Sequence, residues 1–127
     1  MNGVQVLLID DEVGYTDALA KRLDRRGLSV TAADGGPQAL EIMASKSFDV
    51  VLLDIKMAGM DGIKTLRAIK RRHPEVEVVM LTAHANTDIV ISSLAMGAFD
   101  YLLKPADVEE LGRKIEDAAM RKRSNSK

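Results

Sequence analysis

The clearest strand signal in the chain lies in VVLLDIKMAGMDG, from Val50 to Gly62. Four apolar residues, Val50 to Leu53, lead directly into Asp54, and glycines follow shortly after it. A short, unbroken apolar run that ends at turn residues is typical of a strand buried on both faces of a parallel sheet. The sequence therefore predicts a central strand with a carboxylate where the strand ends.

Other short apolar runs recur along the chain, and between them apolar residues return at helical spacing. With Asp49–Leu53, the runs are Val4–Ile9, Leu28–Ala33, Val76–Leu81 and Phe99–Leu103. In chain order, the second run (Leu28–Ala33) and the fifth run (Phe99–Leu103) are interrupted by polar residues. Such interruptions suit strands at the edges of a sheet. Tyr15, Leu19 and Leu23 illustrate the helical spacing. Strands alternating with helices predict an α/β fold, a doubly wound five-stranded parallel sheet with helices on both faces.

The expected helix ends carry residues that favour termination or capping. Gly27 and Gly97 follow two of the helical patterns and are predicted to adopt the left-handed conformation that closes a helix. Asp107 precedes the last pattern, with Glu110 three residues later, which is the spacing of a capping box.

The composition limits the class of protein. The chain has 127 residues, no cysteine and no tryptophan, so we expect one domain with an aliphatic core, no disulfide framework and no thiolate metal site. Its first residues lack the basic leader of a signal peptide, and no apolar stretch is long enough to cross a membrane. We therefore expect a soluble, cytoplasmic protein without a membrane partner.

Charge is distributed unevenly along the chain. The last seven residues, RKRSNSK, hold four of the 18 basic residues and none of the 19 acidic ones, which leaves a formal charge of −5 on the rest. We interpret residues 1–120 as the domain and residues 121–127 as a basic tail or the start of a linker. Such an acidic domain is not expected to bind nucleic acid directly, because that binding relies on neutralising phosphates.

Polar side chains follow the predicted strands at their carboxyl ends, where parallel α/β sheets bind ligands. They are Asp10, Asp11 and Glu12 after the first strand, Asp54 after the third, Thr82 after the fourth, and Lys104 with Pro105 after the fifth. Each residue alone has an ordinary interpretation: Asp10 or Asp11 as a helix N-cap, Thr82 as a strand end, Lys104 as part of a turn. The topology, however, would make all of them neighbours.

Neighbouring carboxylates repel one another and call for a cation. At an effective dielectric constant of 20, two like charges about 4 Å apart cost roughly 4 kcal/mol. Mg²⁺ suits Asp10, Asp11 and Asp54 because it prefers carboxylate oxygens and accepts phosphate oxygens, and no histidine or cysteine in the set favours zinc. Acids, a hard cation, a lysine and a hydroxyl together indicate phosphoryl transfer, with Asp54 as the nucleophile that forms an aspartyl phosphate.

Four segments in order carry a resemblance to a known family over essentially the whole chain. They are LLIDDE (Leu7–Glu12), DVVLLDIKMAGMDG (Asp49–Gly62), VVMLTAH (Val78–His84) and GAFDYLLKP (Gly97–Pro105). The chain resembles the receiver domain of two-component response regulators. The resemblance implies a flavodoxin-like (βα)5 fold with strand order 2-1-3-4-5, and a phosphoacceptor signalling domain rather than an enzyme, with at most self-catalysed phosphoryl transfer and autodephosphorylation.

The resemblance also implies roles for individual residues. Asp54 accepts the phosphoryl group; Asp11 and Asp54 ligate Mg²⁺ directly, or Mn²⁺ as a substitute, and Asp10 acts through water. The backbone carbonyl of Lys56 is a further metal ligand. Lys104 pairs with the phosphoryl group, and Thr82 hydrogen-bonds one of its oxygens. The Lys104–Pro105 peptide bond is expected to be cis.

The implied partners follow from the same resemblance. A sensor histidine kinase or a phosphotransfer protein donates the phosphoryl group from a phosphohistidine. Thr82 then moves inward and Tyr101 rotates into the vacated space, which changes the face formed by the fourth helix, fifth strand and fifth helix. That face controls an output domain or a downstream protein. Formation of a homodimer on phosphorylation is a further possibility that the resemblance leaves undecided. Tyr101 has the alternative interpretation of an ordinary edge-strand aromatic residue.

Two residues near the expected phosphoryl group suggest control of its lifetime. Lys56 and His84 each lie two residues beyond a site residue, and we hypothesise that their bulk slows loss of the phosphate. The alternative is that both are simply solvated.

Two other functions compete with phosphoacceptance. A hydrolase of the haloacid-dehalogenase kind expects an Asp-x-Asp pattern after the first strand, whereas Asp10 and Asp11 are adjacent and Glu12 follows them. A phosphorylation-independent docking module of the same fold would normally lack one of the acids, the threonine or the lysine.

Overall fold

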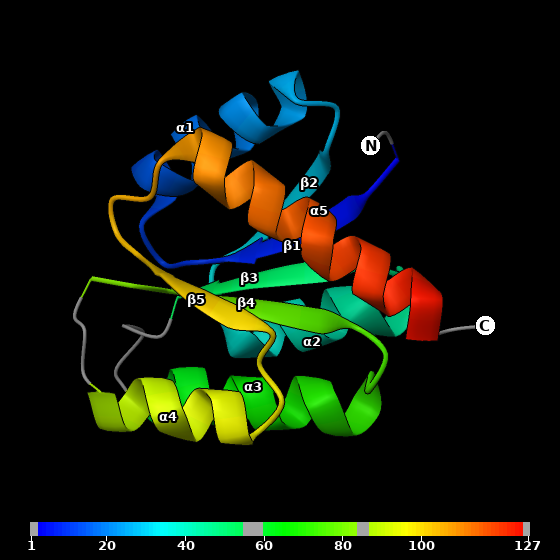
Figure 1. Ribbon diagram of the computed structural model, residues 1–127, viewed down its shortest axis with the longest axis vertical. Coiled ribbons are helices and arrows are strands. Elements are labelled where there is room, and N and C mark those ends of the chain that lie inside the picture. The colour runs from blue at the N-terminus through cyan, green and yellow to red at the C-terminus, as the bar shows by residue number, and fades with distance from the viewer. Residues whose placement is uncertain (1–2, 55–59, 84–86, 126–127) are drawn as a thin grey trace.

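A computed structural model describes residues 3–54, 60–83 and 87–125 of the chain. Strands and helices alternate along it (Figure 1). The strands are β1 (Gln5–Ile9), β2 (Ser29–Ala33), β3 (Val50–Asp54), β4 (Glu77–Thr82) and β5 (Asp100–Leu103). The helices are α1 (Val13–Arg25), α2 (Gly36–Ser45), α3 (Met60–Arg72), α4 (Thr87–Ala95) and α5 (Val108–Asn125).

The sheet has the predicted topology. Its strands are all parallel and lie in the order β2-β1-β3-β4-β5. Helices α1 and α5 cover one face, and α2, α3 and α4 cover the other (Figure 1). The expected doubly wound, flavodoxin-like α/β fold is therefore confirmed.

Alternating side chains of the central strands supply two apolar cores. Every residue of β3 and β4 is buried, as the unbroken apolar runs predicted. On β3, Leu52 packs with the core beneath α1 and α5, whereas Leu53 packs with the core on the α2 and α3 side. This burial on both faces fixes the strand register, because a shift by one residue would exchange the two sets.

The helix ends follow the predicted residues. Gly27 and Gly97 have φ values of 88° and 104°, so both take the left-handed conformation that favours glycine after a helix. Asp107 Oδ1 accepts a hydrogen bond from the Glu109 amide at 3.3 Å, as expected for the N-cap of α5. At the start of α1 the N-cap is Glu12, so neither Asp10 nor Asp11 holds that position.

Helix α5 extends beyond the expected domain end at residue 120 and continues to Asn125. Its last turns lie at the amino ends of the central strands, where the basic residues meet buried acids. Arg121 Nε is 3.2 Å from Glu77, and Lys122 Nζ is 3.3 Å from Asp49. Residues 121–125 are thus part of the helix, and the positive charges of residues 121–123 neutralise carboxylates at the base of the sheet.

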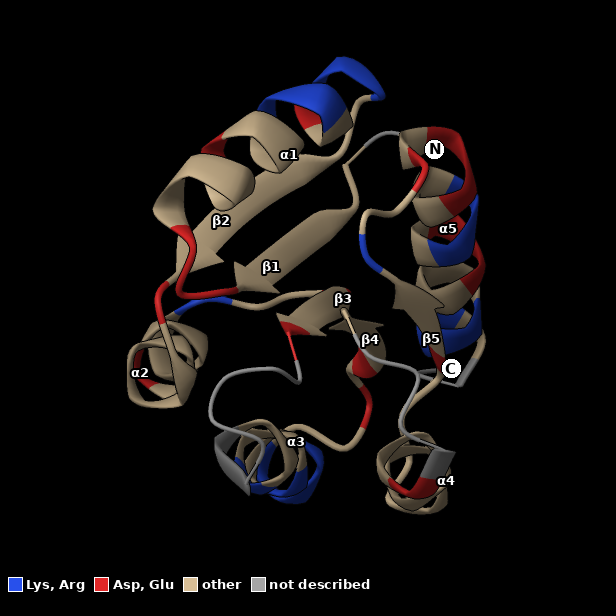
Figure 2. Cartoon of the chain, turned by 90° about the vertical axis from the view of Figure 1, so that its left-hand side faces the viewer, with Lys and Arg blue, Asp and Glu red and all other residues tan. Residues whose placement is uncertain are grey.

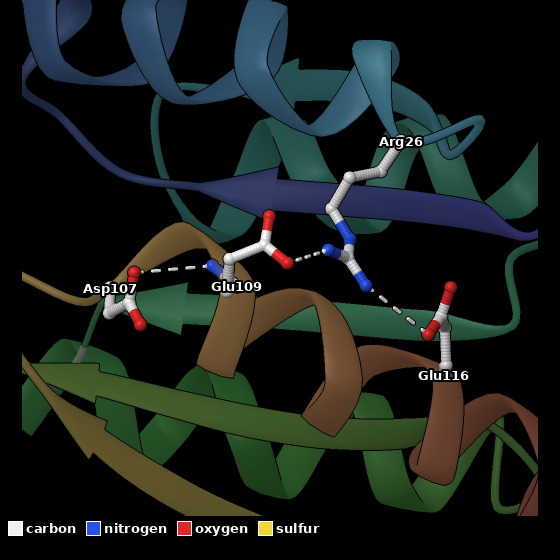
Figure 3. A network of polar contacts seen from close by, with 4 residues as sticks. All are labelled: Arg26, Asp107, Glu109 and Glu116. Carbon is white, nitrogen blue, oxygen red and sulfur yellow. Dashed lines mark hydrogen bonds and ion pairs between the residues drawn. The ribbon is translucent and has the colours of Figure 1, made fainter.

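Arg26 connects α1 to α5 on one face of the sheet (Figure 3). Its guanidinium lies 2.8 Å from Glu109 and 3.5 Å from Glu116. Gly112 lies between these two acids in the sequence of α5, and a Cβ atom there would meet Arg26 Nε at 2.1 Å. The absence of a side chain at Gly112 is therefore what lets Arg26 lie against the helix.

Candidate phosphoacceptor site

The sheet topology brings the predicted polar residues to one edge. Asp10 directly follows β1, Asp54 ends β3, Thr82 ends β4 and Lys104 directly follows β5. Parallel pairing aligns these ends, with Asp54 opposite Leu81 and Thr82 opposite Leu103. Figure 2 shows acidic segments at the ends of β1 and β3 on this edge.

Lys104 joins two of the predicted acids. Its Nζ lies 2.7 Å from Asp10 Oδ2 and 3.1 Å from Asp54 Oδ2. The Asp10 and Asp54 side chains are fully buried, and that of Lys104 is 10% exposed. One ammonium is therefore shared by two desolvated carboxylates, which strengthens the attraction relative to a surface pair.

The surroundings of Lys104 favour its charged form. Burial alone lowers the pKa of the Lys104 ammonium, but the hydrogen bonds to Asp10 and Asp54 and the charges of these carboxylates outweigh burial and hold that pKa above its ordinary value. Lys104 is thus a fixed positive charge at neutral pH.

Asp11 and Glu12 complete an acidic cluster around Asp10 and Asp54. One carboxylate oxygen from each of the four residues lies within 4.8 Å of the others. Asp11 and Glu12 are exposed, so the cluster is buried on one side and open on the other. Four oxygen donors without histidine or cysteine fit a hard cation such as Mg²⁺, which keeps some of its waters.

Short local bonds hold the loop that carries these acids. Asp10 Oδ1 accepts from the Glu12 amide at 2.9 Å, and Thr16 Oγ1 donates to the Glu12 carbonyl at 2.9 Å. The turn between β1 and α1 is thereby fixed, with Asp10 Oδ2 left to face Lys104.

The remaining predicted residues lie at or near this edge. Thr82 is 3% exposed, and its carbonyl accepts from the Lys104 amide at 2.8 Å. The Lys104–Pro105 peptide bond is cis. Tyr101 lies on β5, the outermost strand on one side of the sheet, and its side chain is 36% exposed. Lys56, with its backbone carbonyl, and His84 lie outside the described residues.

Two residues of the site were given no role from the sequence. Glu12 was noted at the end of the first strand but was not predicted as a metal ligand, and the structure places it in the acidic cluster. Tyr15, in the first turn of α1, places its ring centroid 4.6 Å from Lys104 Nζ. Its helical spacing with Leu19 and Leu23 indicated only a core position.

Comparison with known proteins identifies the family. The family model "Response regulator receiver domain" matches residues 6–116. The chain belongs to this family. It is a receiver domain of the two-component type, which is a class of signalling domains rather than classical enzymes.

Individual relatives agree with this assignment. The DNA-binding transcriptional regulator NtrC of Escherichia coli K12 is 42% identical over 113 residues, 89% of this chain and 24% of NtrC. A response regulator receiver domain structure from Clostridium thermocellum superposes with a TM-score of 0.89 at 34% identity, covering 95% of this chain and 98% of that one. NtrX from Brucella abortus gives a TM-score of 0.91 at 31% identity, covering 99% of this chain and 29% of NtrX.

This receiver domain spans about a quarter of the length of the curated relatives it matches. Within the described ranges, no helix is both long enough and apolar enough to span a bilayer.

Proposed function

We propose that this receiver domain accepts a phosphoryl group on Asp54 from a phosphohistidine of a histidine kinase or phosphotransfer protein. The observation that carries the proposal is the Asp54 carboxylate, fully buried at a strand end, 3.1 Å from the Lys104 ammonium and within the acidic cluster. An Asp54 oxygen attacks phosphorus, the bond from phosphorus to the imidazole nitrogen breaks, and the imidazole leaves with the electron pair.

The chain's own residues stabilise the transferred group. Lys104 already contacts Asp54, so its charge is in place to neutralise an oxygen of the phosphoryl group. The Thr82 hydroxyl, at the end of the neighbouring strand, donates to another oxygen. Mg²⁺, held by Asp11 and Asp54 directly, by Asp10 through water and by the Lys56 carbonyl, would neutralise the charge that accumulates on the phosphoryl oxygens; Mn²⁺ is expected to substitute.

The signal leaves through the α4-β5-α5 face. Ile91 and Leu94 on α4, and Tyr101 and Leu103 on β5, are large apolar side chains that are between 36% and 59% exposed. Phosphorylation draws Thr82 inward and Tyr101 turns from its exposed position toward the vacated space. The altered face then controls an output domain or a downstream protein, with or without homodimerisation. Lys56 and His84 are proposed to slow dephosphorylation.

The test uses acetyl phosphate as a small phosphodonor. Intact mass spectrometry should show one added phosphoryl group in the presence of Mg²⁺ and none with EDTA. Asp54→Asn should abolish the addition, whereas Asp34→Asn, which changes an exposed aspartate outside the cluster, should leave it unchanged. Continuous release of phosphate without accumulation would favour a hydrolase, and no reaction at all would favour a phosphorylation-independent docking module; either result would overturn the proposal.

A further inference from the structure

The Lys104 ammonium has a third neighbour besides its two carboxylates. Asp10 and Asp54 lie at 2.7 Å and 3.1 Å, and the Tyr15 ring centroid lies 4.6 Å from the same Nζ atom. A cation within about 6 Å of an aromatic ring centroid is attracted by the negative face of the ring. Lys104 is therefore held from three directions, by β1, β3 and α1.

The Tyr15 ring is itself fixed. It is partly buried and packs against the apolar core beneath α1 and α5. Burial raises the pKa of the Tyr15 phenol, and although the nearby Lys104 charge lowers that pKa, the balance leaves it above its ordinary value. Tyr15 thus stays neutral at physiological pH, with its ring packed against the core.

A lysine side chain benefits more than most from a contact that restricts its conformation. Its flexible four-carbon stem has many rotamers, and holding them in one geometry loses conformational entropy. When Asp54 carries a phosphoryl group, Lys104 must turn from a carboxylate oxygen to a phosphoryl oxygen. The ring face stays chemically unchanged during this exchange and, unlike the Asp10 carboxylate, carries no net charge that would compete with the phosphoryl group for the ammonium.

We propose that Tyr15 is a positioning residue, which uses its ring face to hold the Lys104 ammonium over Asp54. The proposal rests on the phosphoacceptor function proposed above. Its chemical requirement is the aromatic face rather than the hydroxyl group.

Two substitutions separate the ring face from its apolar bulk. Tyr15→Phe keeps the ring, and Tyr15→Leu keeps an apolar side chain without it. Using the full chain with acetyl phosphate and Mg²⁺, we expect Tyr15→Phe to phosphorylate within about twofold of the wild-type rate and Tyr15→Leu about 3- to 30-fold more slowly. Phe99→Leu is the matched control, since Phe99 packs in the same core but its ring faces Arg121 at 5.7 Å.

A spectroscopic signature separates positioning from stability. In ¹³C-labelled lysine spectra, the Lys104 Cε protons should be shifted upfield by the Tyr15 ring in wild type, Tyr15→Phe and Phe99→Leu, and this shift should disappear in Tyr15→Leu. Lys104→Arg assigns the signal by removing it.

The outcomes distinguish this inference from the proposed function. An unshifted Lys104 signal in the wild type, or a Tyr15→Leu variant with the wild-type rate, would overturn the positioning role. If the wild type accepts no phosphoryl group, the proposed function fails, and the upfield shift still decides whether Tyr15 holds the ammonium.

Discussion

At the level of single residues, the site depends on one ammonium shared by two buried carboxylates. Asp10, Asp54 and Lys104 lie at the ends of three different strands, yet Lys104 Nζ is within 3.1 Å of both carboxylates. Removing one partner from such a buried group leaves an uncompensated charge, which is more costly than losing a surface ion pair.

Lys104→Met should therefore lower the free energy of unfolding in EDTA by about 2–4 kcal/mol, because Asp10 and Asp54 then repel each other without a cation. Urea denaturation followed by circular dichroism measures this change. Lys114→Met is the matched control: Lys114 pairs with the partly exposed Asp100, so we expect less than about 1 kcal/mol. Equal losses in the two variants would contradict the account.

The contribution of Lys104 should also depend on pH. Because its pKa is raised in the folded state, the stabilisation is fully present below the ordinary lysine pKa of 10.5 and is lost as pH rises through the folded-state value. The difference in unfolding free energy between wild type and Lys104→Met should shrink above pH 10.5. Urea titrations across this pH range measure the difference in unfolding free energy. A difference that stays constant or widens above pH 10.5 would contradict the raised pKa of Lys104.

Much of the site could be predicted from the sequence, because strand ends and residue types are local properties. Asp10, Asp54 and Lys104 were placed together by topology alone, and the structure brings them into contact. The Tyr15 contact could not be predicted, because it depends on the angle at which α1 crosses the sheet. Spacing within a helix does not contain that information.

At the level of elements, the packing of α1 against α5 depends on a glycine. Gly112 is buried, and a Cβ atom would meet Arg26 Nε at 2.1 Å. Alanine normally stabilises a helix interior by about 1 kcal/mol relative to glycine. At Gly112 this gain in helix stability is opposed, because the added methyl group would displace Arg26 from its ion pairs with Glu109 and Glu116.

A double-mutant cycle tests this contact. Gly112→Ala should be neutral or destabilising in the wild type and should stabilise by about 0.5–1 kcal/mol in an Arg26→Ala background. Thermal or urea unfolding of the four proteins gives the coupling energy. Additive effects would mean that Arg26 does not need the space at Gly112.

At the level of the whole molecule, the strand runs and helix caps made the fold predictable, whereas the contacts of the residues after Met120 could not be predicted. The basic residues after Met120 were interpreted as a tail or the start of a linker, because the sequence does not show which acids they would contact. Asp49 and Glu77, at the starts of β3 and β4, supply those acids, with side chains only 11% and 8% exposed. The two ends of the sheet thus both rely on charge neutralisation.

Truncation tests the role of this last helical segment. A chain ending at Met120 should have a free energy of unfolding about 1–2 kcal/mol lower than that of the full chain. The reason is that Asp49 and Glu77 no longer pair with Arg121, Lys122 and Arg123. A chain ending at Arg123 keeps all three and should match the full chain. Identical urea midpoints for both truncations would show that the domain ends at residue 120.

We propose Asp54, which lies beside Lys104 and within the acidic cluster, as the phosphoacceptor. The most direct measurement is reductive trapping: borohydride converts an aspartyl phosphate to homoserine, and peptide mass spectrometry locates the converted residue. After phosphorylation with acetyl phosphate, we predict homoserine at position 54, dependent on Mg²⁺. Homoserine at Asp10 or Asp11 instead, or at no position although phosphate is incorporated, would contradict the account.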